Sequence, residues 1–163
     1  MSDPLTAAIV AIALRAHAAA EAADQQTRRW AAQHAAERLR SVACVAEALY
    51  FEARGEGARG MAAVADVVEN RVAEGRGPDE CAVVREPGQF TYRPGRIGEP
   101  ASWAASLALA GLAVDGLLPD VTGGATYYHA SYVHPAWADV LRRTATIGLH
   151  RFYTTVPARL ASR

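Results

Sequence analysis

Apolar and polar residues follow a helical period through the middle of the chain. From residue 42 to residue 53 the apolar side chains recur at spacings of three, four and seven: Val42, Val45, Ala46, Leu49 and Ala53. Such a stripe along one face predicts an amphipathic helix. A second stripe of the same period runs from Met61 to Val72. The pattern therefore predicts two successive helices that contribute to one core.

One carboxylate borders the first stripe. Glu52 comes three residues after Leu49 and three before Gly55, a residue type that often ends helices, so it is predicted in the last helical turn. Apolar neighbours and the negative end of the helix dipole both disfavour a charged carboxylate there. A glutamate in this setting can stay protonated near neutral pH and act as a general acid. The alternative is a surface ion pair of Glu52 with Arg54 or Arg71.

The rest of the chain predicts further helices and a small late β region. Residues 1–41 are rich in alanine, a strong helix former, and residues 103–114 also predict a helix. Residues 126–129 and 143–153 predict strands. Residues 85–100 form a Gly- and Pro-rich loop, and a loop of this length more often serves a site than merely connects elements. The predicted class is α+β, mainly helical.

Composition and charge exclude several kinds of partner. The 163 residues are enough for one domain with a real core. The formal net charge of zero gives no electrostatic case for nucleic acid. The apolar segment 5–14 is too short to span a bilayer, so no stable membrane insertion is expected. No lysine or arginine precedes this segment, which leaves the export route open.

Several short motifs occur in an order that resembles one known family. The resemblance is carried by YFEARGE at 50–56, VVENR at 67–71, QFT at 89–91, TGGATYY at 122–128, PAW at 135–137 and IGLHRFY at 147–153. Together they resemble the SleB-like cell wall hydrolases, a family of spore-cortex and cell-wall lytic enzymes. The resemblance implies a catalytic domain at 42–156, preceded by a helical extension at 1–41 and followed by a tail at 157–163. It also implies a lysozyme-like fold.

The activity that the resemblance implies is cleavage of peptidoglycan between N-acetylmuramic acid and N-acetylglucosamine. The expected mechanism is that of a lytic transglycosylase with Glu52 as the catalytic glutamate. A hydrolytic muramidase or a phage-like endolysin is the alternative, and a two-carboxylate mechanism would need a second acid, for which Glu56 is the close candidate. Action in the cell envelope on peptidoglycan strands is expected, with an envelope or phage-like lysis partner left open.

More distant alternatives are a metal-assisted amidase and a non-catalytic wall-binding module. A metal site would have to use His129, His134 and His150, none of which stands in a tight ligand spacing such as HExxH. No metal and no other cofactor are therefore expected.

Five residues are candidates for substrate binding: Gln89, Tyr127, Tyr128, Trp137 and His150. Aromatic rings can stack on sugar faces, although neighbouring strand positions point to opposite sides, so only one of Tyr127 and Tyr128 need be buried. The loop from residue 86 to residue 98 is predicted to line the groove, with Phe90 anchored in the core. Cys44 and Cys81 are the only cysteines. They are either two buried thiols or, in an oxidising compartment, a disulfide.

Overall fold

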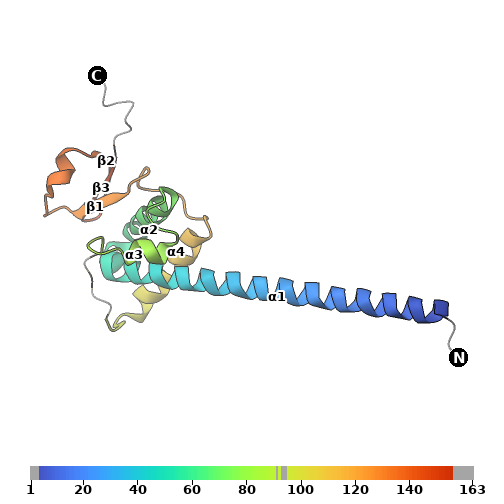
Figure 1. Ribbon diagram of the computed structural model, residues 1–163. Helices are drawn as coiled ribbons and strands as arrows, with labels where there is room; N and C mark the ends of the chain where they lie inside the picture. Colours follow the sequence, from blue (N-terminus) through green and yellow to red (C-terminus); the bar gives the residue numbers. More distant parts are fainter. Residues whose placement is uncertain (1–3, 91, 93–94, 156–163) are drawn as a thin grey trace, which may run out of the picture. The chain divides into compact units, whose positions relative to one another are not determined.

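The structure is a computed structural model that describes residues 4–90, 92 and 95–155. The chain divides into two units, Met1–Arg38 and Leu39–Arg163. The first helix, α1 (Pro4–Ala53), begins in the first unit and ends in the second (Figure 1). Side chains 11–40 along it are exposed. The N-terminal segment is thus helical, as its alanine content predicts. No helix among the described residues is long and apolar enough to cross a membrane.

Three more helices follow within the second unit. These are α2 (Gly57–Ala73), α3 (Glu80–Val84) and α4 (Pro100–Val114), and a 3-10 turn, η1 (Arg54–Glu56), joins α1 to α2. Asp79 caps α3 by accepting a hydrogen bond from Ala82 N at 2.7 Å, and Pro100 occupies the first turn of α4, where its missing N–H costs nothing. The predicted helices are confirmed.

The strands form one antiparallel sheet late in the chain. Its order is β1 (Tyr127–Ala130), β3 (His150–Thr154) and β2 (Arg142–Ile147), so β3 is the central strand. In the register, Tyr128 lies opposite Phe152, and Ala130 opposite His150. A short 3-10 segment, η2 (Ala136–Asp139), lies between β1 and β2. The protein is mainly helical with a small sheet, which confirms the predicted class.

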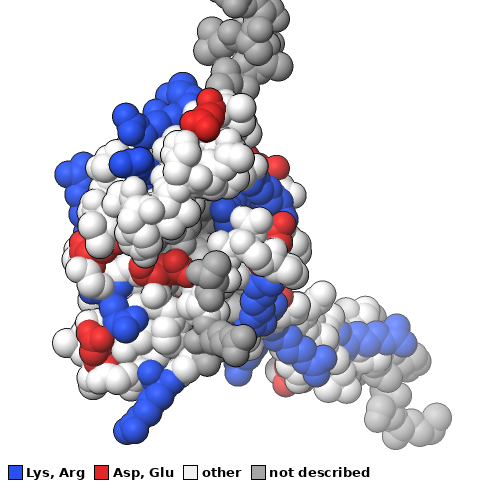
Figure 2. All heavy atoms as spheres, turned by 90° about the vertical axis from the view of Figure 1, so that its left-hand side faces the viewer, with Lys and Arg blue, Asp and Glu red and all other residues white. Residues whose placement is uncertain are grey.

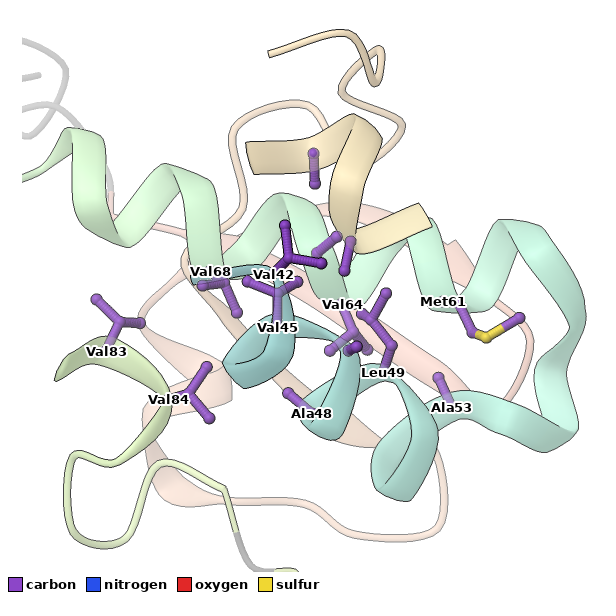
Figure 3. Packing of buried hydrophobic residues seen from close by; sticks show 14 residues of the cluster. Val42, Val45, Ala48, Leu49, Ala53, Met61, Val64, Val68, Val83 and Val84 are labelled. Atoms are coloured by element: carbon purple, nitrogen blue, oxygen red, sulfur yellow. The ribbon is translucent and has the colours of Figure 1, made fainter. Parts of the chain in front are cut away.

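The core is built from the two predicted apolar stripes. Val45 and Leu49 of α1 and Val64 and Val68 of α2 are fully buried and share one cluster with Val83 of α3 (Figure 3). Burying each such side chain contributes about 1.5–3 kcal/mol. A second cluster joins Ala63 and Val67, from the neighbouring face of α2, to Phe152 and Ile147 of the sheet. The helix α2 is therefore packed on both sides, and it holds the sheet close to the end of α1.

A disulfide fixes the end of α1 to α3. Cys44 and Cys81 are bonded, with an S–S distance of 2.00 Å and a sequence separation of 37 residues. Of the two readings that the sequence left open, the structure shows the disulfide. Beside it, Ser41 Oγ donates a hydrogen bond of 2.5 Å to Glu80 Oε2. The helix that carries Glu52 is thus held covalently eight residues before that side chain.

Candidate active site

Glu52 lies in the last turn of α1, as predicted, and is half-buried. Its carboxylate accepts a hydrogen bond from the hydroxyl of Tyr128, with 3.1 Å between Tyr128 Oη and Glu52 Oε2. The alternative of an ion pair is wrong. Arg54 pairs with Glu99 at 2.8 Å instead. Glu52 and Tyr128 are 76 positions apart in the sequence, and only the folding of β1 against α1 brings them together.

Tyr128 is held as a hydrogen-bond donor. Burial, together with the neighbouring Glu52 carboxylate, raises the pKa of Tyr128 well above its ordinary value. The phenol is therefore protonated at neutral pH. Its ring stacks on Phe152 with centroids 5.7 Å apart and meets His150 edge-on at 5.1 Å. These contacts fix the direction of the hydroxyl toward Glu52.

The end of α2 sets the position of β1. Asn70 Nδ2 donates to Ala125 O at 3.1 Å, and Arg71 Nε donates to Thr126 O at 2.8 Å. Arg71 is almost fully buried, and burial lowers its pKa. Its guanidinium lies 5.6 Å from the centre of the Phe90 ring. The Asn-Arg pair at the end of the VVENR motif therefore anchors the two residues that lead into the strand carrying Tyr128.

The turn before β1 is organised by a pair of carboxyl groups. Asp120 accepts hydrogen bonds from the backbone N–H groups of Thr122, Gly123 and Gly124 at 2.6–3.1 Å. Asp66 of α2 accepts one from Val121 N at 2.7 Å. Burial above all, with a smaller contribution from the neighbouring Asp120 carboxyl, raises the pKa of Asp66 to about 7 against the lowering effect of the Val121 hydrogen bond. Asp66 and Asp120 thus tie the TGGATYY segment to α2.

A groove of about 560 Å³ opens beside Glu52. Its described lining consists of Phe51, Glu52, Gly88, Gln89, Tyr92, Tyr128, His129, Ala130, Tyr132, Val133 and His150. The lining therefore comes from the end of α1, from the loop after α3, from β1 with its following turn and from the start of β3. Figure 2 shows a hollow on this side of the protein with acidic atoms in it and basic side chains around it.

The loop after α3 contributes to the groove as the sequence predicted. Gln89 lies in the lining, and Phe90 packs against the main core cluster. The far end of the loop is held by Tyr50, whose hydroxyl accepts hydrogen bonds from the backbone N–H groups of Gly98 (3.0 Å) and Glu99 (3.1 Å). Arg93, which with Arg85 and Arg96 gives this stretch basic side chains in the sequence, lies outside the described residues.

Two of the predicted binding residues lie elsewhere. Tyr127 and Trp137 pack on each other with ring centroids 5.6 Å apart, and the guanidinium of Arg76 lies 4.5 Å from the Tyr127 ring. Neither residue is in the described lining of the groove. Strand alternation explains this placement, because Tyr127 faces away from the side on which Tyr128 points to Glu52. Tyr128, Gln89 and His150 are the candidates that the fold brings to Glu52.

Glu56 is close to Glu52 in sequence but contacts a different part of the protein. Glu56 Oε1 lies 2.9 Å from His150 Nδ1, and Glu56 Oε2 accepts a hydrogen bond from Leu149 N at 3.2 Å. Its side chain is only 12% exposed. His150, by contrast, reaches the groove lining.

Sequence reasoning missed several lining residues. Phe51 and Tyr92 stack with ring centroids 5.1 Å apart and an interplanar angle of 15°. Tyr132, 83% exposed, and Val133 follow β1 at the groove's edge. Phe51 lies within the YFEARGE motif and Tyr92 directly follows the QFT motif, and these positions could have indicated them. No pattern in the sequence distinguishes Tyr132 and Val133 from other loop residues.

The histidines do not assemble into a metal site. Among the residues that the structure describes, no group of three or more His, Cys, Asp or Glu side chains could hold a metal ion. His134 instead pairs with Asp139 at 2.9 Å, and the Nε2 atom of His129 lies 3.0 Å from Tyr153 Oη. The metal-assisted alternative therefore has no ligand set in this part of the chain.

Comparison with known proteins agrees with this geometry. The chain is similar to the catalytic domain of the SleB protein of Bacillus cereus, at 28% identity and a TM-score of 0.56, over 70% of this chain and 89% of that one. It is also similar to the catalytic domain of the germination-specific lytic transglycosylase SleB of Bacillus anthracis, at 28% identity and a TM-score of 0.52, over 70% and 93% of the two chains. No curated protein sequence matches significantly.

A family model described as Cell Wall Hydrolase matches residues 55–153. The match starts three residues after Glu52 and includes the loop, the turn before β1 and the sheet up to residue 153 of β3. It covers more than half of the chain, and the solved structures extend the likeness to the fold. The chain belongs to the cell wall hydrolase family.

Proposed function

We propose that this protein is a lytic transglycosylase that cleaves the peptidoglycan strand between N-acetylmuramic acid and N-acetylglucosamine, with Glu52 as its catalytic residue. One observation carries the proposal. Among the described residues that line the groove, Glu52 is the only carboxylate. A glycosidase that activates a water or forms a covalent intermediate normally needs two carboxyl groups flanking the bond. A groove with one carboxyl group suits a reaction in which the substrate supplies its own nucleophile.

The reaction is balanced with a single glutamate. The protonated Glu52 gives its proton to the glycosidic oxygen, and the bond between that oxygen and C1 of the muramic residue breaks. The resulting carboxylate then takes the proton of the muramic 6-hydroxyl, whose oxygen bonds to C1. The product is a 1,6-anhydro sugar, and Glu52 ends the cycle protonated again. Tyr128, through its 3.1 Å hydrogen bond, stabilises the carboxylate form between the two steps.

The lining offers contacts that suit a glycan. Sugar rings present apolar faces, and Phe51, Tyr92 and Tyr132 place aromatic rings along the groove. Gln89 provides an amide that can donate to and accept from hydroxyl and acetamido groups. A polar groove with few charges matches a neutral sugar chain better than it matches a nucleotide or a lipid.

Action on peptidoglycan places the reaction on the envelope side of the cell. The Cys44–Cys81 disulfide fits an oxidising compartment outside the cytoplasm. The lytic activity named for the Bacillus anthracis relative supports the same substrate class.

Digestion of purified sacculi tests the proposal. Wild-type protein should release muropeptides that end in 1,6-anhydromuramic acid, and Glu52→Gln should release none while keeping its fold by circular dichroism. Muropeptides with a reducing muramic end, and no anhydro product, would show a hydrolytic muramidase instead. Sacculus binding without any release would show a wall-binding module.

A further inference from the structure

Glu56 is enclosed by the protein although it does not line the groove. It lies in η1, between α1 and α2, and its side chain is 12% exposed. A buried carboxylate is costly unless nearby groups compensate its charge. For Glu56 these groups come from the turn between β2 and β3, 92 to 94 residues further along the chain.

The turn is built around the Glu56 carboxylate. Leu149 N donates to Glu56 Oε2 at 3.2 Å, and His150 Nδ1 lies 2.9 Å from Glu56 Oε1. The second contact has ion-pair distance without the alignment of a regular hydrogen bond. At Gly148, with φ +57°, a Cβ atom would collide with the Glu56 carboxylate. Three consecutive residues, 148–150, therefore pack directly on one side chain.

His150 connects the Glu56 carboxylate with the groove. Its ring lines the groove and meets the ring of Tyr128 edge-on, with centroids 5.1 Å apart and an interplanar angle of 84°. Tyr128 in turn donates to Glu52. Glu56 and Glu52, four positions apart in the chain, are thus connected in space through His150 and Tyr128.

We propose that Glu56 is a positioning residue, which acts through His150 to hold Tyr128 and the groove wall in place for Glu52, and is not a second carboxylate that acts on the substrate. The inference rests on the proposed function of Glu52. A carboxylate beside Nδ1 fixes the orientation of an imidazole ring and leaves the opposite ring edge for another contact. Here that contact is with the groove.

A double-mutant cycle tests the link. Glu56→Gln, His150→Gln and the double variant are compared with wild type for kcat and KM on soluble peptidoglycan fragments and for thermal unfolding. We expect Glu56→Gln to lower kcat about 10- to 100-fold, with KM changed by less than about threefold, because the charged contact between the Glu56 carboxylate and His150 Nδ1, at 2.9 Å, is lost. The kcat of the double variant should be no lower than that of the less active single variant, since both substitutions break the same pathway.

Glu80→Gln is the matched control. Glu80 is also a half-buried glutamate with a hydroxyl partner, Ser41, but it lies on α3 and not at the groove. Its substitution should lower the unfolding temperature by a similar amount and leave kcat within about twofold. A kcat effect confined to Glu56 and His150 therefore cannot come from lost stability.

Three outcomes would overturn the inference. One is a folded Glu56→Gln protein with wild-type kcat, and another is losses that multiply in the double variant. The third is complete inactivity of Glu56→Gln that azide restores, which would make Glu56 a second catalytic carboxylate. If Glu56→Gln does not fold, the His150→Gln variant alone tests the inference, because an unchanged kcat of that variant would show that Glu56 does not act through His150. A wild-type protein that releases no anhydro product would refute the proposed function instead.

Discussion

Replacing Tyr128 by phenylalanine removes one atom from the active site. The lost hydroxyl is the donor of the 3.1 Å hydrogen bond to Glu52 Oε2. The aromatic ring stays, and with it the stacking on Phe152 and the edge contact with His150. The substitution therefore tests the hydrogen bond and leaves the packing of β1 unchanged.

The size of the effect follows from the kind of hydrogen bond. A hydrogen bond to a charged group contributes about 1.5–3 kcal/mol, about twice that of a neutral one. Glu52 is charged after it has protonated the leaving group, so the bond is stronger in and after the transition state than in the ground state. Its loss should therefore lower kcat, by about 10- to 100-fold, and leave KM nearly unchanged.

The assay is the rate of anhydro-muropeptide release from soluble peptidoglycan fragments, followed by chromatography and mass spectrometry. Tyr127→Phe is the matched control, because Tyr127 is the next residue in β1 but packs on Trp137 and outside the groove lining. It should keep wild-type kcat. The reasoning is refuted if Tyr128→Phe turns over as fast as wild type, or if both variants lose the same activity.

Three further predictions concern stability and the loop. Replacing both Cys44 and Cys81 by alanine should lower the free energy of unfolding by about 4 kcal/mol, because the disulfide closes a loop of 37 residues; denaturant unfolding measures this, and an unchanged midpoint would contradict it. The pKa of Asp66 is raised to about 7, so the contribution of Asp66 to the free energy of unfolding is fully present below about pH 4 and is lost as pH rises through 7. Asp66→Asn should therefore flatten the decline in melting temperature from pH 5 to pH 8. An unaltered decline would show that Asp66 does not cause it. Gln89→Ala should raise KM about fivefold, the value of one neutral hydrogen bond, and equal KM values would leave Gln89 without a role.

Much of the helical part could be predicted because it is encoded locally. The stripes that contain Val45, Leu49, Val64 and Val68 have a clear period, and all four side chains are fully buried. Glu52 could be placed in a last helical turn for the same reason. Local pattern also separates the two tyrosines of β1, since alternation allows only one of them to face the helices.

The partners of these residues could not be predicted from spacing. Glu52 meets Tyr128 across 76 residues, and Glu56 meets Leu149 across 93. Contacts of this range depend on how the sheet packs on α2, which follows from side chains such as Phe152 and Ile147 acting together. For the same reason the sequence suggested ion pairs of Glu52 that the structure does not contain.

The role of Asn70 also emerged only from the structure. In the sequence it stands in a family-like motif with no evident chemistry, whereas its side chain binds a backbone carbonyl 55 residues away. Motif resemblance indicated that this position belongs to the pattern, and the hydrogen bond explains why.

Digestion of purified peptidoglycan in water labelled with heavy oxygen tests the central claim most directly. If Glu52 alone carries the reaction and the muramic 6-hydroxyl is the nucleophile, the muramic ends released by wild-type protein contain no label and are lighter by one water than a hydrolysed end. Glu52→Gln should release neither product. Heavy oxygen at the muramic end would show that water is the nucleophile, and would contradict the single-carboxylate mechanism.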